Sequence, residues 1–205
     1  MFAFDFILLL VGAYFLGSIP FGYLIVRWWK GIDVRRVGSG NIGFANVVRA
    51  AGWLPGFLVL FLDAVKGFLP VFVALNVFHF SRSLSCIIGG AGIIGHIFPV
   101  FLSFQGGKGV ATALGVAIAI FKFWILIPLA FFVLSLLVSR IVSLSVFLAI
   151  ASVLVMVLLI PDYAKDLSFI LIIVATALLI LYRHRENVKR LLAGKELKLQ
   201  AKSGE

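Results

Sequence analysis

The feature that most limits how this chain can fold is a series of long apolar runs. From Phe6 to Val26 no charged residue occurs, and similar runs return through most of the sequence. A helix needs about 20 residues to cross about 30 Å of hydrocarbon, because it rises about 1.5 Å per residue. With 63% hydrophobic and only 13% charged residues, a chain of 205 residues cannot bury these runs in one soluble core. The sequence therefore predicts an all-α, polytopic membrane protein.

We expect about seven transmembrane helices in a single bundle, and a single domain over residues 1–205. The predicted helices are 4–26, 54–78, 83–103, 110–121, 124–139, 143–160 and 167–183. The fourth and fifth are short and only Lys122 supplies a charge between them, so one long helix or a re-entrant pair would reduce the count to five or six. The first run lacks the basic start and cleavage site of a signal peptide, which predicts a retained helix.

Basic residues are concentrated in two segments, and this asymmetry predicts the orientation. The formal net charge is +10, and most of the lysines and arginines lie in 27–53 and in the tail 184–205. The positive-inside rule places both segments in the cytoplasm and the amino terminus outside. Lys108 and Arg140 then also lie at cytoplasmic ends. Topology and attraction to anionic membrane lipids account for the excess of charge, so no nucleic-acid partner is expected.

A glycine-rich turn carrying one lysine interrupts the apolar sequence at 106–109. Gly106, Gly107 and Gly109 can leave their N–H groups uncovered, and Lys108 adds a positive charge, so the turn could hold a phosphate. Lys108 is not followed by Ser or Thr, which disfavours a nucleotide triphosphatase loop. The alternative is a flexible hairpin whose lysine reaches lipid headgroups.

The loop 37–49 is a second candidate for binding an anion. Its glycines free the backbone, its small polar side chains offer hydrogen bonds, and its arginine offers a bidentate fork for a phosphate. The residues concerned are Gly38, Ser39, Gly40, Asn41, Gly43, Asn46 and Arg49. A solvated turn is the alternative, although such a turn does not need this density of small polar residues.

Two charged residues stand inside the predicted second helix. Asp63 and Lys66 are one turn apart and meet on one face. Because a charge at the centre of a membrane helix costs about 2.5–3.5 kcal/mol, both should face the bundle interior, as a structural ion pair or as part of a site. His96, near the cytoplasmic end of the third helix, is either a packed residue or part of the site beside Gly106.

Two further polar groups are predicted on the cytoplasmic face. Ser143, two residues before Ser145, could cap the sixth helix so that its amino end points at an anion, or act as a plain N-cap. His184, Asn187 and Leu191 share a helical face after the last span, where the two polar residues could hold a substrate or close the bundle.

Two cationic loops on one membrane face suggest two phosphate-bearing ligands held side by side. A substrate with an acyl chain could arrive from the bilayer and a soluble one from the cytoplasm, which is a geometry for lipid synthesis. A transporter for phosphate or a phosphorylated metabolite is the alternative, although no repeated halves with paired broken helices are visible. A structural scaffold would leave both loops unexplained.

The chain also resembles a known family nearly end to end. The matching motifs are Gly17-Ser18-Ile19-Pro20-Phe21-Gly22, Gly38-Ser39-Gly40-Asn41 with Asn46 and Arg49, Asp63-Ala-Val-Lys66-Gly67, Gly95-His96-Ile-Phe98-Pro99, Gly106-Gly107-Lys108-Gly109-Val-Ala-Thr112, Ser143-Leu-Ser145, and Arg183-His184 with Asn187 and Glu196. In this order they are similar to the bacterial acyl-phosphate-dependent glycerol-3-phosphate acyltransferases, the PlsY family.

The resemblance implies a seven-helix enzyme of the inner membrane with its active site facing the cytoplasm. Its members transfer a fatty acyl group from acyl phosphate to the sn-1 hydroxyl of glycerol 3-phosphate, the first step of membrane phospholipid synthesis. The implied products are lysophosphatidic acid and inorganic phosphate. No metal, nucleotide or other cofactor is expected, and an upstream enzyme that forms acyl phosphate is an implied partner.

The resemblance also implies roles for individual residues. Lys108, Ser39, Arg49 and His96 are the expected catalytic residues. His96 either accepts the hydroxyl proton or orients other groups while a donor phosphate oxygen accepts it. Ala45 stands where the family usually has Thr or Ser, so one phosphate contact is expected to be missing. The expected substrate-binding residues are Gly38, Gly40, Asn41, Asn46, Gly106, Gly107, Gly109, Ser143, Ser145, His184 and Asn187.

Overall fold

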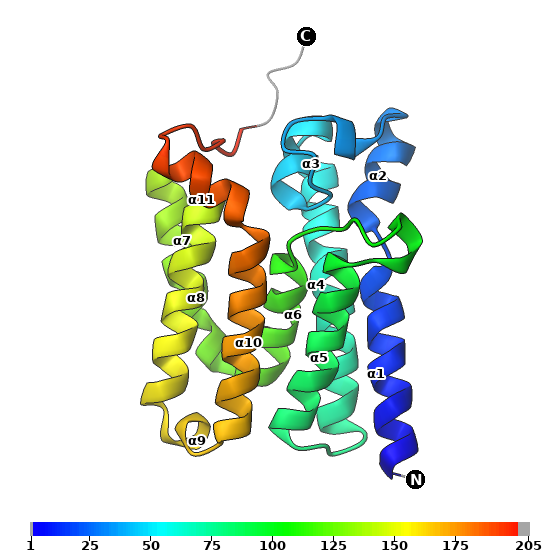
Figure 1. The fold of residues 1–205 in the computed structure, drawn as a ribbon, viewed down its shortest axis with the longest axis vertical. Helices are drawn as coiled ribbons and strands as arrows, with labels where there is room; N and C mark the ends of the chain where they lie inside the picture. Colours follow the sequence, from blue (N-terminus) through cyan, green and yellow to red (C-terminus); the bar gives the residue numbers. More distant parts are fainter. Residues whose placement is uncertain (1, 201–205) are drawn as a thin grey trace. The chain divides into compact units, whose positions relative to one another are not determined.

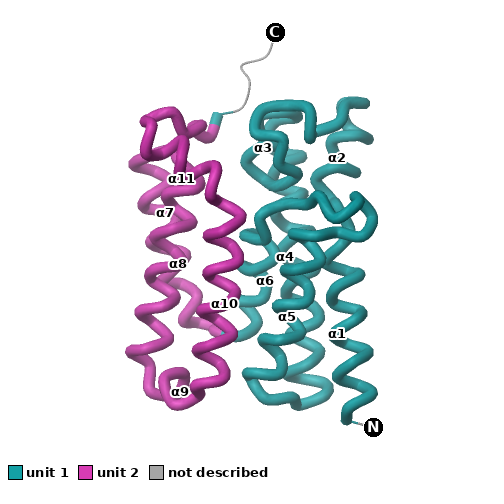
Figure 2. Tube along the Cα trace, in the orientation of Figure 1, with its two compact units in different colours: residues 1–120, 200–205 teal, residues 121–199 magenta. Residues whose placement is uncertain are grey.

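The computed structural model describes residues 2–200, and this part of the chain contains helices and loops but no strand (Figure 1). It divides into two compact units, which Figure 2 draws in teal and magenta. Among the described residues, the first unit comprises 2–120 and Gln200, and the second comprises 121–199. The all-helical fold confirms the predicted class.

The first unit is built on α1, α4 and α5, which pack against one another. Its elements are α1 (Phe2–Ser18), α2 (Phe21–Lys30), η1 (Val34–Arg36), α3 (Phe44–Ala51), α4 (Trp53–Asn76), α5 (Arg82–Ile97), η2 (Val100–Leu102) and most of α6 (Val110–Phe121). α6 lies against α4, where Gly115 closely approaches the Ala64 backbone. Small residues at such contacts let membrane helices pack without large side chains between them.

The second unit is a group of helices around α8. α7 (Leu126–Ser139) and α10 (Leu167–Arg183) both contact α8 (Val142–Leu159). The remaining elements are η3 (Lys122–Ile125), α9 (Pro161–Ala164) and α11 (Arg185–Leu192). An aromatic cluster closes the end beside α9, where the rings of Phe121, Tyr163 and Phe169 contact one another. The tail predicted over 184–205 begins with α11, while 201–205, including Lys202, lie outside the described residues.

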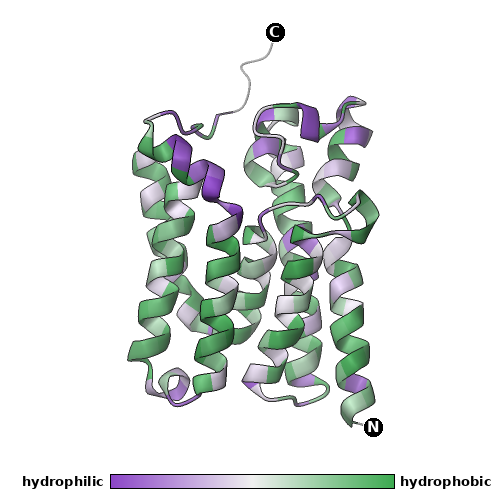
Figure 3. Ribbon diagram, in the orientation of Figure 1, coloured by the Kyte–Doolittle hydropathy of each residue, from purple (hydrophilic) through white to green (hydrophobic). Residues whose placement is uncertain are grey.

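Hydrophobic residues cover the helices of both units, and hydrophilic ones gather in places such as α11 (Figure 3). Within residues 2–200, five helical stretches are long and apolar enough to cross a membrane, or six if the bent pair α10 and α11 forms one span. The stretch Val110–Ser139 counts once, although it consists of α6, η3 and α7 and Lys122 in η3 has a φ of +50°. The count of seven spans and the sides of the membrane on which the termini lie stay predictions.

Two predicted segments were wrong in detail. The first span, expected as one helix over 4–26, breaks between α1 and α2 at Ile19 and Pro20, because proline has no N–H to continue the helical ladder. The second half of the expected loop 37–49 is helical, since α3 begins at Phe44 after Gly43 at its N-cap. Its apolar side chains Val47 and Val48 are fully buried.

Candidate active site

Asn46 organises the loop that contains Ser39. The side chain comes from the first turn of α3 and is 1% exposed. Its Nδ2 lies within hydrogen-bond distance of three carbonyl oxygens, those of Val34 (3.1 Å), Val37 (2.9 Å) and Asn41 (2.9 Å). Its Oδ1 accepts a hydrogen bond from the Ser39 N–H at 2.9 Å. One buried amide therefore holds both ends of the segment 34–41.

Gly38 shows why this loop needs a glycine. Its φ is +56°, a backbone conformation that is unfavourable for any residue with a Cβ. A Cβ at this position would also overlap Asn46 Oδ1. The backbone at residue 38 can thus approach the Asn46 side chain only because glycine has no side chain of its own.

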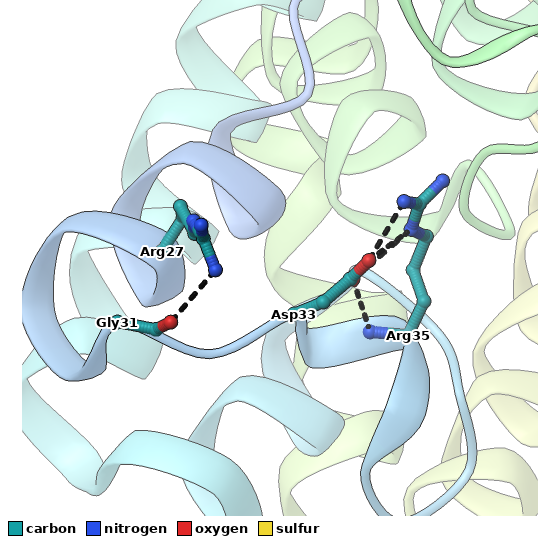
Figure 4. A network of polar contacts seen from close by, with 4 residues as sticks. All are labelled: Arg27, Gly31, Asp33 and Arg35. Carbon is teal, nitrogen blue, oxygen red and sulfur yellow. Dashed lines mark hydrogen bonds and ion pairs between the residues drawn. The ribbon is translucent and has the colours of Figure 1, made fainter.

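A charged network lies just before this loop (Figure 4). Asp33 accepts two hydrogen bonds from Arg35 Nε, at 3.0 and 3.2 Å, one from Arg35 Nη2 at 2.7 Å and one from the Arg35 backbone N–H at 3.0 Å. Hydrogen bonding to the guanidinium lowers the pKa of Asp33 to about 2. Arg27 Nη1 donates to the Gly31 carbonyl at 2.7 Å, next to the end of α2. The segment leading to Ser39 is thereby fixed by charge-assisted hydrogen bonds.

The glycine-rich turn is folded onto the end of α5. The Gly106 N–H donates to the Ile97 carbonyl at 3.2 Å and the Gly107 N–H donates to the His96 carbonyl at 3.0 Å. Gly107 also lies against the His96 ring, because a Cβ at Gly107 would overlap His96 Nε2. His96 thus holds the residue that precedes Lys108 through both its backbone and its side chain.

The two loops share one apolar support. A buried cluster made by α2, η1, α3, α4 and the residue Ile42 contains Ile25, Val26, Val34, Ile42, Val47 and Val59. Leu102, from η2 just before the glycine-rich turn, packs against this cluster. Ile42, which follows the Ser39 segment, and Leu102, which precedes the Lys108 turn, therefore meet at the same group of side chains within the first unit.

Several N–H groups expected to face an anion instead hold the loops together. In the first loop, Gly40 donates to the Val37 carbonyl at 3.0 Å and Gly43 donates to Asn41 Oδ1 at 2.8 Å. The N–H groups of Ser39, Gly106 and Gly107 donate to Asn46 Oδ1, the Ile97 carbonyl and the His96 carbonyl, in that order. Anion binding by these loops would consequently depend more on side chains such as those of Ser39 and Lys108 than the sequence suggested.

Asp63 and Lys66 form a fully buried ion pair. Lys66 Nζ lies 2.7 Å from Asp63 Oδ1, and both side chains are 1% exposed. His96, which is 3% exposed, places its Nδ1 3.5 Å from the same carboxylate oxygen. The sequence predicted that both charges lie inside the bundle. It did not indicate that His96, 33 residues from Asp63, lies beside the Asp63 carboxylate.

In the second unit, Ser143 does not cap α8 as expected. Ile141 occupies the N-cap position and Ser143 lies inside the first turn, so its hydroxyl is not placed at the helix end. The Ser143 Oγ is buried and has no hydrogen-bond partner among the described residues. Ser145, two residues further on, bonds the Ser135 Oγ at 3.1 Å and the Ile141 carbonyl at 3.0 Å. Of the two serines, Ser143 retains a hydroxyl that a ligand could use.

A buried carboxylate, for which the sequence suggested no role, binds two side chains of α11 in the second unit. Glu196 is 5% exposed and accepts hydrogen bonds from Asn187 Nδ2 at 2.8 Å and from Arg190 Nε at 3.0 Å. His184 Nδ1 lies 2.8 Å from the Ile180 carbonyl, and its ring contacts Phe147. The predicted pair His184 and Asn187 is buried, as a site on the shared helical face requires.

Known proteins with similar sequences identify the family. The family model described as glycerol-3-phosphate acyltransferase matches residues 7–194. A glycerol-3-phosphate acyltransferase from Aquifex aeolicus (strain VF5) is 44% identical over 194 residues, covering 92% of this chain and 96% of the relative. The chain belongs to the glycerol-3-phosphate acyltransferase family.

Solved structures of this family agree with the fold. A crystal structure of PlsY, described as an integral membrane glycerol 3-phosphate acyltransferase in its glycerol 3-phosphate form, matches with a TM-score of 0.88 and 41% identity over 96% of both chains. The lysophosphatidic acid form of PlsY matches with a TM-score of 0.85 and 40% identity over 95% of both chains. Together with the apolar helices, these likenesses confirm the resemblance to PlsY and a multi-pass membrane protein.

Proposed function

We propose that this protein transfers a fatty acyl group from acyl phosphate to the sn-1 hydroxyl of glycerol 3-phosphate. The products are lysophosphatidic acid and inorganic phosphate, and residues 1–205 act as one acyltransferase domain. The observation that carries the proposal is the pair of glycine-rich cationic loops on one apolar support, which can serve two phosphorylated substrates. The glycerol 3-phosphate and lysophosphatidic acid forms of the PlsY structures support the choice of substrate and product.

The chemistry requires mainly orientation and stabilisation of charge. The sn-1 oxygen attacks the acyl carbon, a tetrahedral oxyanion forms, and the bond from that carbon to the phosphate oxygen breaks. Acyl phosphate is a mixed anhydride with a good leaving group, so placing the two substrates and stabilising the oxyanion lower most of the barrier. We assign to Lys108 the stabilisation of the oxyanion, and its positive charge also attracts the departing phosphate.

The proton of the attacking hydroxyl goes to a phosphate oxygen of the donor. His96 is less suited to accept it, because its Nδ1 faces Asp63 and its Nε2 edge faces Gly107. Both ring nitrogens are therefore turned towards the protein. We assign His96 to orienting the turn that carries Lys108.

The remaining residues of the first unit have different roles. Ser39 and Asn41 are assigned to acyl phosphate, and the guanidinium of Arg49 is assigned to glycerol 3-phosphate. Gly40, Gly106 and Gly107 use their N–H groups within the protein, so we assign them, together with Gly38, Asn46 and Gly109, to shaping the two loops. In the second unit, Ser143, Ser145, His184 and Asn187 stay predicted substrate-binding residues.

The setting we propose is the bacterial inner membrane, with the active site facing the cytoplasm. The basic segments 27–53 and 184–205 support this orientation through the positive-inside rule. Acyl phosphate is reactive towards water, so an upstream enzyme that forms it must supply the substrate, and its acyl chain can reach the site from the bilayer.

The test measures phosphate release by the purified protein in detergent. Wild type should release inorganic phosphate from palmitoyl phosphate only when glycerol 3-phosphate is present. Lys108→Ala should reduce the rate by at least about 10²-fold, the usual cost of removing an oxyanion donor. Lys122→Ala, which changes an exposed lysine of η3, is the matched control and should behave like wild type. Counterflow of labelled glycerol 3-phosphate in proteoliposomes without acyl product would instead show a transporter.

A further inference from the structure

The buried ion pair of α4 has partners on two other helices. Two charges with 1% exposure lose nearly all their hydration, and one ion pair restores this only when further polar contacts complete it. Lys66 has such a contact in a hydrogen bond to a backbone carbonyl. The Asp63 carboxylate has no hydrogen-bond partner among the described residues, and its further polar neighbour is the His96 ring on another helix. This arrangement gives the pair more than a local role.

Lys66 reaches the break between α1 and α2. Its Nζ donates to the Ile19 carbonyl at 2.8 Å and lies 5.5 Å from the centre of the Phe21 ring. The Ile19 carbonyl lies outside both helices, where the ladder is interrupted before Pro20. Lys66 therefore fixes the point at which the chain turns into α2, and α2 leads directly to the segment of Asp33 and Ser39.

Asp63 contacts His96, the residue that holds the Lys108 turn. Its Oδ1 lies 3.5 Å from His96 Nδ1, and the opposite edge of that ring lies against Gly107. The His96 carbonyl accepts the Gly107 N–H at 3.0 Å. Any movement of the His96 ring would therefore displace Gly107 and the adjoining Lys108.

We propose that Asp63 and Lys66 are a positioning pair that sets the placement of the Ser39 loop relative to the Lys108 turn. Both side chains are 1% exposed, so each acts through another residue, Lys66 through Ile19 and Asp63 through His96. The proposal rests on the proposed function, because the two loops are taken to hold the two substrates. An ion pair that only stabilises the bundle would not tie the two loops together.

The test removes both charges at once, so that no unpaired charge stays buried. Asp63→Asn combined with Lys66→Met keeps similar side-chain volumes. The matched control is Glu186→Gln with Lys189→Met, an ion pair of α11 with the same spacing but 57% and 71% exposed side chains. Helix content by circular dichroism and elution as a single species identify the folded fraction, to which all rates are referred.

We expect kcat per folded molecule to fall about 10²-fold in the buried double variant, with KM for both substrates changing less than about threefold. Misplacing two bound substrates by about 1 Å costs this much rate while leaving each binding site intact. The control should keep the wild-type kcat. A folded buried double variant with a kcat within twofold of wild type would overturn the proposal, because a purely stabilising pair changes the amount of folded enzyme only.

Two readouts separate this inference from the proposed function. The ring nitrogens of His96, assigned by comparison with His96→Gln, should change their ¹⁵N chemical shifts in Asp63→Asn, and the Gly107 amide should exchange faster with solvent. These changes are expected even if wild type fails to turn over acyl phosphate, which would refute the proposed function alone. Unchanged shifts and exchange would refute the positioning role. Should the double variant not fold, Asp63→Asn combined with Lys66→Gln, which also leaves no unpaired charge, supplies the same kcat comparison.

Discussion

Asn46→Asp tests whether one buried amide holds the loop that presents Ser39. The substitution keeps the shape and the oxygen that accepts the Ser39 N–H. It replaces the donor Nδ2 with an oxygen that faces the carbonyls of Val34, Val37 and Asn41. Oxygen would then face oxygen where the loop now has hydrogen bonds.

The magnitude follows from the hydrogens available. The amide has two N–H groups, so the three carbonyls share two donors. Losing each of these bonds and leaving its acceptor unsatisfied costs about 1–3 kcal/mol. Since water can reach part of the loop but not Asn46 itself, we expect the loop to lose about 2–4 kcal/mol. At about 1.4 kcal/mol per factor of ten, its open state becomes about 30 to 1,000 times more populated.

Amide hydrogen exchange measures this opening directly. The Gly40 N–H donates to the Val37 carbonyl, which also accepts from Asn46 Nδ2, so its exchange reports the opening of the turn that Asn46 holds. It should exchange about 30 to 1,000 times faster in Asn46→Asp, up to its rate in an unstructured chain. Asn76→Asp is the control, because Asn76 is exposed and makes one bond within α4. An unchanged Gly40 rate in Asn46→Asp would show that other contacts hold the loop.

Three further predictions concern other parts of the molecule. Gly107→Ala should lower kcat/KM about 10²-fold, because its Cβ would overlap His96 Nε2 and displace the turn. Asp33 should titrate with a pKa of about 2 by carbon NMR, and Arg35→Met should return it towards its ordinary value of 3.8. Because the folded pKa is lowered, the stabilisation from this ion pair is complete above about pH 5 and is lost as the pH falls towards 2. Glu196→Ala should destabilise the protein by about 2–3 kcal/mol, measured by thermal unfolding, since two donors lose their carboxylate.

Each of these predictions has a control or a contradicting result. Gly90→Ala adds a Cβ in open space on α5 and should leave activity unchanged, so equal losses in both alanine variants would contradict the steric argument. A carboxyl inflection near pH 4 for Asp33 in wild type would mean that the pair with Arg35 does not persist in solution. Glu186→Ala alters an exposed carboxylate and should leave thermal unfolding nearly unchanged, so a loss as large as that of Glu196→Ala would contradict the importance of burial.

The apolar runs were sufficient to predict the main helices. The span predicted at 54–78 is α4 at Trp53–Asn76, and the one predicted at 167–183 coincides with α10. A backbone in lipid must satisfy its own hydrogen bonds, so a long apolar run has little choice but to be helical. The short helix α3 was missed because its polar and glycine-rich surroundings resemble a loop, and tertiary burial of Val47 and Val48 decides its conformation.

The candidate site could be predicted only as a set of residue types. Glycines, small polar residues and cations marked the two loops, and the helical spacing paired Asp63 with Lys66. Local sequence cannot show that Lys66 bonds Ile19, 47 positions away, or that Leu102 packs against the cluster that contains Ile42. It also cannot show that the N–H of Gly107 is used within the protein rather than offered to an anion. Such contacts depend on how the helices pack.

Phosphorus NMR of the purified protein with palmitoyl phosphate and glycerol 3-phosphate tests the central claim most directly. If two phosphorylated molecules are held so that one acylates the other, the signal of acyl phosphate will disappear while inorganic phosphate and lysophosphatidic acid appear in equal amounts. Mass spectrometry should place the acyl group on the sn-1 oxygen. Release of inorganic phosphate without lysophosphatidic acid, or no reaction with a folded protein, would contradict the account.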